Sequence, residues 1–139
     1  MRHRVYGKHL GRDKNGRTAL FRSLVQALII SEKIRTTEPK AKAIKGLIDK
    51  LITQAKSPST RRMVSQFLTH KQLSDKLIKD IVPRLGNRQS GYTSMVKIGR
   101  RMGDGASMVQ VNLLTEEVKE PLKIKETAKQ TKTFKKVGV

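Results

Sequence analysis

The segment TEPKAKAIKGLIDKLITQAK, residues 37–56, decides the fold that this sequence predicts. It opens with a capping residue, an acid and a proline in the first turn, which together are a strong start signal for a helix. Its apolar side chains lie within roughly 140° of one another at 100° per residue, and charged side chains take the other sides. The apolar set is Ile44, Leu47, Ile48, Leu51, Ile52 and Ala55, and the charged set is Lys42, Lys45, Asp49 and Lys50. The segment therefore predicts an amphipathic helix that packs on a core and ends at Ser57-Pro58.

The residues before this segment predict a second helix and a short strand. Asn15 can cap a helix that runs over residues 15–31. The helix has a wide apolar face, which indicates contacts from more than one direction. That face consists of Leu20, Leu24, Ala27 and Leu28, widened by Phe21 and Val25. Residues 33–37 then alternate and are rich in β-formers, which predicts a strand that leads into the helix over residues 37–56.

The residues after the segment first predict two shorter helices, over residues 59–69 and 72–82. Pro83 ends the second of them. The spacing places one set of apolar side chains inward, namely Met63, Phe67, Leu73, Leu77 and Ile81.

From Gly91 onward the apolar period changes from 3.6 to 2, which predicts strands. In the first strand Ser94, Val96 and Ile98 share a face, and in the second Val109, Val111 and Leu113 share a face. Between the strands, Gly103-Asp104-Gly105 is a turn signal. The pattern therefore predicts a hairpin with a basic, glycine-rich tip.

The order of these elements is helix, strand, three helices and two strands. It predicts an α+β fold of two layers, with helices packed on one face of a small sheet. We expect three parts: a basic RNA-binding arm over residues 1–17, an α/β domain over residues 18–114 and a flexible tail over residues 115–139.

The composition points to a polyanionic partner. The 31 Lys and Arg residues outnumber the 11 Asp and Glu residues, giving a formal net charge of +20. Self-repulsion at that charge destabilises a compact free protein, and nucleic acid relieves it. We expect no membrane insertion, because the longest apolar stretch, residues 19–30, is too short to span a bilayer. A mitochondrial presequence stays open as an alternative to a cytoplasmic location, since the first 31 residues are basic with Asp13 as their one acid.

The chain offers little for catalysis, so we expect no enzyme, no cofactor, no metal site and no small-molecule substrate. It has no cysteine, no nucleophile elbow and no phosphate loop, and its three histidines are scattered at positions 3, 9 and 70. Asp75 and Asp80 lie about 140° apart on a helix and do not face one site. A metal-dependent nuclease that uses Asp104 is kept as one alternative. A DNA-binding regulator that uses the two short helices around His70 is kept as another.

Two clusters of cations indicate phosphate binding, and arginine dominates both although the whole chain is rich in lysine. The planar guanidinium group bonds phosphate through two parallel hydrogen bonds and stacks on bases. Tyr6 and Tyr92, next to glycines and cations, are candidate base-stackers, whereas Phe21 and Phe67 lie at core spacing. The first cluster, in the arm, is Arg2, His3, Arg4, Lys8, His9, Arg12, Lys14 and Arg17. The second is Arg84, Arg88, Lys97, Arg100 and Arg101, with no acid among them.

The same clusters carry a resemblance to the bacterial ribosomal large-subunit protein seventeen family. The matching motifs are MRHR with GKxLGR over residues 1–12, IRTTEPKAK over residues 34–42, RxxGYT over residues 88–93 and KIGxR with GDxAxM over residues 97–108. The sequence departs from the family pattern at residues 13–16, DKNG. The resemblance implies a structural constituent of the ribosome that binds large-subunit (23S) ribosomal RNA and neighbouring ribosomal proteins near the rim of the peptide exit tunnel. It also implies a cytoplasmic, ribosome-bound location.

Overall fold

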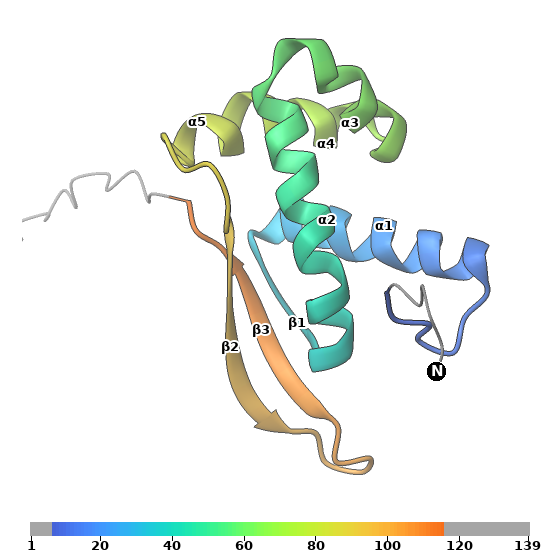
Figure 1. The fold of residues 1–139 in the computed structure, drawn as a ribbon. Helices are drawn as coiled ribbons and strands as arrows, with labels where there is room; N and C mark the ends of the chain where they lie inside the picture. Colours follow the sequence, from blue (N-terminus) through green and yellow to red (C-terminus); the bar gives the residue numbers. More distant parts are fainter. Residues whose placement is uncertain (1–6, 116–139) are drawn as a thin grey trace, which may run out of the picture.

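The computed structural model describes residues 7–115, in which helices cover one face of a small antiparallel sheet (Figure 1). The predicted α+β class is confirmed. The first half of the order is α1 (Lys14–Ser31), β1 (Lys33–Thr37), α2 (Glu38–Lys56) and the 3₁₀ turn η1 (Pro58–Thr60). The second half is α3 (Arg61–Phe67), α4 (Lys71–Lys76), the π-helical turn η2 (Leu77–Ile81), α5 (Val82–Arg84), β2 (Thr93–Arg100) and β3 (Ser107–Leu113). The expected flexible tail after residue 115 and the first six residues of the arm lie outside the described residues.

Helix α1 begins at a different cap from the one predicted. Asp13, not Asn15, is the N-cap, and its carboxylate accepts a 2.9 Å hydrogen bond from the Gly16 backbone N–H. The negative charge of an aspartate cap also interacts favourably with the positive N-terminal end of the helix dipole, an interaction that a neutral asparagine lacks. Lys14 and Arg17, which the sequence assigned to the arm, therefore stand on the first turns of α1.

Helix α2 lies across the middle of the molecule and packs on the sheet (Figure 1). Its predicted inward face is confirmed, with Ile44, Ile48, Leu51, Ile52 and Ala55 buried. Thr37 is the N-cap as predicted, although its side chain makes no capping hydrogen bond. Because α2 touches both the other helices and the strands, it joins the two layers.

The inward face predicted for the short helices after α2 is wrong at Met63, whereas Phe67 and Leu73 pack against the core as predicted. Met63 is 53% exposed, whereas Val64 and Leu68 are buried. Burial in α3 therefore centres on Val64 and the following Leu68, with Phe67 at the edge of the core. Leu77 and Ile81 are buried as predicted, although they lie in the wider π-helical turn η2.

The sheet has the strand order β1-β3-β2, with antiparallel pairing throughout. The predicted inward face of β3 is confirmed, since Val109, Val111 and Leu113 are buried. In β2, Val96 and Ile98 are both exposed. Val96 lies opposite Gln110 of β3, on the face of the sheet that points away from the helices. The register between β2 and β3 then shifts between Lys97 and Gly99, which is a bulge-like irregularity near the end of β2.

Candidate nucleic-acid interface

The described part of the arm is held by backbone and side-chain hydrogen bonds to itself. Arg12 donates through Nη1 to the Leu10 carbonyl at 3.0 Å, and Leu10 lies in the left-handed region with φ of 52°. Arg17 reaches back from α1, with its Nη1 2.8 Å from His9 Nδ1. Lys8, His9, Arg12 and Lys14 are all exposed. The arm thus presents a cluster of cations whose backbone is anchored at the start of α1.

The hairpin tip presents a second set of exposed cations, Lys97, Arg100 and Arg101. Arg101 is paired locally, because its Nη2 lies 2.5 Å from Asp104 Oδ2. The Arg101 guanidinium, together with the Ala106 backbone N–H, lowers the pKa of Asp104 to about 2. Lys97 and Arg100 are in no ion pair among residues 7–115.

The structure brings the arm and the hairpin tip together, which the sequence did not predict. A groove of about 420 Å³ is lined by Lys8 from the arm, Lys40 and Lys42 from the start of α2, and Arg101 from the tip. Two carboxylates, Glu38 and Asp104, also line it. Lys42 pairs with Glu38 at 2.6 Å and thereby lowers the Glu38 pKa. Two cationic segments almost a hundred residues apart therefore form one surface at one end of the molecule.

Arg88 lies at the other end of β2, which at eight residues is about 25 Å long. It is exposed on a loop that α2 holds in place. Lys56 Nζ donates to the backbone carbonyls of Gly86 and Arg88, and Asp49 Oδ1 accepts from the Tyr92 backbone N–H at 3.1 Å. Asp49 and Lys56 are positioning residues that sequence reasoning missed. The only available signal was that they lie seven apart, on the same side of α2.

Two predicted RNA-binding residues are instead parts of the fold. Tyr92 is 1% exposed, its hydroxyl donates to the Gln89 carbonyl at 2.8 Å, and Lys56 Nζ lies 5.0 Å from its ring centre. The expectation that Tyr92 stacks on a base is therefore wrong, because no face of the ring is free.

Arg84 is half-buried and already bonded on both arms of its guanidinium group. It donates to Glu32 Oε1 at 2.7 Å and to Glu32 Oε2 at 3.0 Å. These bonds raise the Arg84 pKa and lower the Glu32 pKa. The second cluster held no acid in sequence, but Glu32 supplies one from 52 residues away. We therefore leave Arg84 out of the interface.

The remaining predicted residues, Arg2, His3, Arg4 and Tyr6, lie outside the described residues. None of the helices within residues 7–115 combines the length and apolar character needed to cross a bilayer. The same residues contain no group of three or more His, Asp or Glu side chains placed to hold a metal ion.

Comparisons with known proteins identify the family of this chain. A family model described as Ribosomal protein L17 matches residues 20–114. Large ribosomal subunit protein bL17 of Koribacter versatilis is 44% identical over 119 residues, which cover 84% of this chain and 74% of the relative. The proteins of the same name from Thermodesulfovibrio yellowstonii and Pelobacter propionicus are 44% and 40% identical. Their alignments cover 76% and 84% of this chain, and 81% and 94% of those relatives.

These matches place the chain in the class of ribosomal proteins, which its small basic α+β body fits. Within that class it belongs to the ribosomal protein L17 family. The predicted resemblance is confirmed. Membership makes the chain a structural constituent of the ribosome, and it supports a structural role rather than a catalytic one.

Proposed function

We propose that this chain binds large-subunit (23S) ribosomal RNA through the surface that the arm and the hairpin tip form together. The observation that carries the proposal is the shared groove in which Lys8, Lys40 and Arg101 meet. Cations from separate segments gathered at one end of a protein of net charge +20 are the electrostatic footprint of nucleic-acid binding.

The mechanism is scaffolding by charge neutralisation. Each phosphate that a Lys or Arg neutralises releases condensed counterions, and the loss of phosphate repulsion lets RNA segments approach. Exposed side chains on fixed backbones suit this task, because the cations are presented with little loss of backbone freedom. The proposed contacts are Lys8, His9, Arg12, Lys14, Arg17, Arg88, Lys97, Arg100 and Arg101. Arg2, His3, Arg4 and Tyr6 stay predicted members of the same arm.

The finer location rests on the family resemblance. It supports a place near the rim of the peptide exit tunnel, beside other large-subunit proteins, in ribosomes of the cytoplasm. Sucrose-gradient fractionation of cells followed by mass spectrometry tests this assignment. We expect the chain in the large subunit at one copy per particle after a high-salt wash, and its loss in that wash would contradict the assignment as a constituent of the large subunit.

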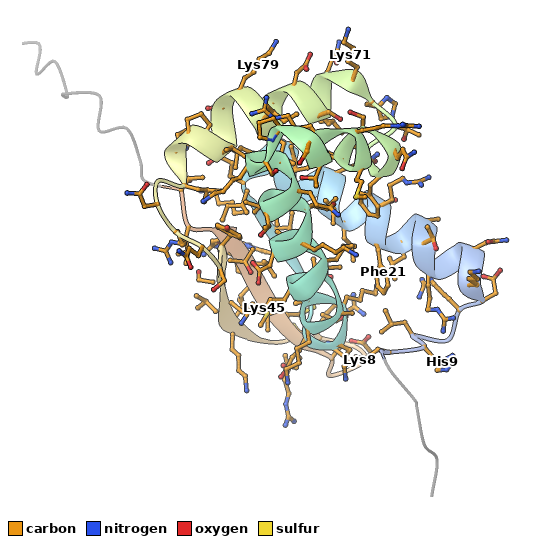
Figure 2. All side chains as sticks on the ribbon, turned by 45° about the horizontal axis from the view of Figure 1, so that its top comes forward. Lys8, His9, Phe21, Lys45, Lys71 and Lys79 are labelled. Atoms are coloured by element: carbon orange, nitrogen blue, oxygen red, sulfur yellow. The ribbon has the colours of Figure 1, made fainter. Side chains whose placement is uncertain are left out.

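The binding surface is tested by paired charge changes at opposite ends of the molecule. The test variant combines Lys97→Gln and Arg100→Gln at the tip. The control combines Lys71→Gln and Lys79→Gln, which lie on the helical layer far from the arm (Figure 2). Filter binding to large-subunit RNA is measured over a range of salt.

The test variant should reduce the slope of log affinity against log salt by about 0.9 for each phosphate that the protein no longer neutralises, or by nearly two in all. The control should leave the slope within error of the wild type. Equal slopes for the two variants would contradict a localised surface, and a preference for duplex DNA would favour the regulator alternative.

A further inference from the structure

A second groove, between the arm, α1 and α2, has a chemistry that the proposed function has not used. Its volume is about 850 Å³, within the range of small-molecule-sized pockets. Figure 2 shows Phe21 between the two helices, with Lys8 and His9 of the arm below it. The apolar floor consists of Phe21 and Leu47, both of which are partly buried against the core.

Four Lys and Arg side chains stand around this floor: Lys8 from the arm, Arg17 from α1, and Lys42 and Lys50 from α2. In the part of the chain that the structure describes, no carboxylate lines the groove. Lys42 is paired with Glu38 on its far side, whereas Lys50 is in no ion pair among residues 7–115. The groove is thus apolar at its floor and positive at its rim.

Gly46 lies between the two lysines on the same line of α2, four residues from each. Its backbone is helical, and glycine in a helix interior is less stable than alanine. A Cβ built at Gly46 would meet nothing within 4 Å, so packing inside the protein does not require glycine there. What the missing side chain provides is open space over bare backbone, between two cations and beside an aromatic ring. Such a place lets a ligand approach the helix closely.

We infer that this groove binds one unpaired nucleotide of RNA, with its base against Phe21 and Leu47 and its phosphate at Lys50 and Lys42. The inference rests on the proposed function, and it adds a recognition element to a surface that otherwise reads only charge. A nucleotide carries a flat apolar face and an anion in one unit, which matches the groove. A base within a duplex is already stacked on both faces, so the ligand is a looped-out or single-stranded base. Phe21, which its spacing in the sequence assigned to the core, then serves as a stacking platform at the edge of that core.

The test uses the full chain and two short single-stranded RNAs. One carries 2-aminopurine at its centre, and the other carries an abasic ribose at the same position. Affinity is measured by anisotropy of an end label at fixed salt. The wild type should bind the first RNA about tenfold more tightly, the size of one base–aromatic stack. Phe21→Leu should abolish that preference.

Gly46→Ala and two lysine variants distinguish loss of the nucleotide site from loss of folding. Gly46→Ala should raise the midpoint of thermal unfolding and yet weaken binding of the 2-aminopurine RNA, because the methyl group fills the space that the nucleotide takes. Lys50→Gln should weaken binding of both RNAs severalfold. Lys45→Gln, a change of the same charge on the same helix but outside the groove lining, should weaken it less (Figure 2).

The outcomes separate the two proposals. If the wild type binds both RNAs equally, the nucleotide site is wrong while RNA binding stands. If it binds neither at low salt, the proposed function itself fails. Nuclear Overhauser contacts between the Phe21 ring and residues 1–6 in the RNA complex would overturn the site by giving the groove to this chain's own start. If an acidic peptide instead displaces the 2-aminopurine RNA and shifts the Gly46 amide resonance, that result would assign the groove to a protein partner.

Discussion

The base and the tip of the hairpin carry similar residues and do different things. The base, residues 84–92, holds Arg84 and Tyr92, and the structure uses both inside the fold. The tip, residues 97–106, holds Lys97, Arg100 and Arg101, which all stay exposed. The difference is burial. Glu32 and α2 enclose the side chains of Arg84 and Tyr92 at the base, whereas the arm and the start of α2 only flank the tip and leave its cations exposed. An arginine in a basic cluster is therefore a candidate RNA contact only where it stays exposed, as Arg101 does beside Asp104 and Arg84 does not beside Glu32.

The largest expected effect is at the base, where Tyr92→Ala should destabilise the protein by about 3–5 kcal/mol. The change leaves a cavity under α2 and removes the hydroxyl that donates to the Gln89 carbonyl. Urea denaturation followed by circular dichroism measures the free energy of unfolding. Ser90→Ala, an exposed neighbour, is the matched control and should cost little. A decrease below about 1 kcal/mol for Tyr92→Ala would mean that the ring is not packed as described.

Arg84→Gln should destabilise the protein by about 1–3 kcal/mol, because the half-buried Glu32 carboxylate loses both of its hydrogen bonds from the guanidinium group. The same variant should bind ribosomal RNA with a salt slope equal to that of the wild type. A lower slope with unchanged stability would return Arg84 to the interface and break the distinction between base and tip.

The same ion pair predicts how stability depends on pH. The Glu32 pKa is lowered from 4.5 in the folded protein, chiefly by the hydrogen bond from Arg84. The unfolded state then binds the proton more readily, so the stabilisation is complete above pH 4.5 and is lost as the pH falls through the folded pKa. The difference in unfolding free energy between the wild type and Glu32→Gln should therefore shrink as the pH is lowered from about 6 to about 3. A difference that stays constant over this range would mean that the carboxylate is not paired in solution.

The smallest expected effect is at the tip. Asp104→Asn should leave the free energy of unfolding unchanged, because the Arg101–Asp104 pair is exposed and local. It should raise RNA affinity slightly, since Arg101 is freed for phosphate. Lowering the pH is no substitute for this mutation, because Asp104, with a pKa of about 2, stays ionised under mildly acidic conditions. A decrease in affinity would show that Asp104 orients Arg101, and magnesium-dependent RNA cleavage abolished by this change would support the nuclease alternative.

The sequence predicted most of the fold because periodicity reports burial directly. The α2 face and the inward face of β3 follow from spacing alone. Prediction was less complete for α3 and β2. Met63, predicted to point inward, is exposed, and its neighbour Val64 is buried instead. The spacing also put Val96 and Ile98 on one face of β2 without saying which face meets the helices, and the structure shows that both are exposed. The residue types of the site were predictable, but the meeting of Lys8 with Arg101 and the pairing of Arg84 with Glu32 depend on the approach of distant segments. No local pattern encodes that approach.

The position of β2 at the edge of the sheet has a consequence for a cell that makes this protein. The outer backbone groups of an edge strand can pair with a strand of another copy. The exposed apolar side chains of Val96 and Ile98 would add buried area to such a contact. Lys97 and Arg100 oppose such pairing only as long as their charges repel each other across two copies. Stray polyanions that mask these charges would remove the protection and promote aggregation. Chains that are not bound to RNA are therefore the ones that this edge exposes to self-association.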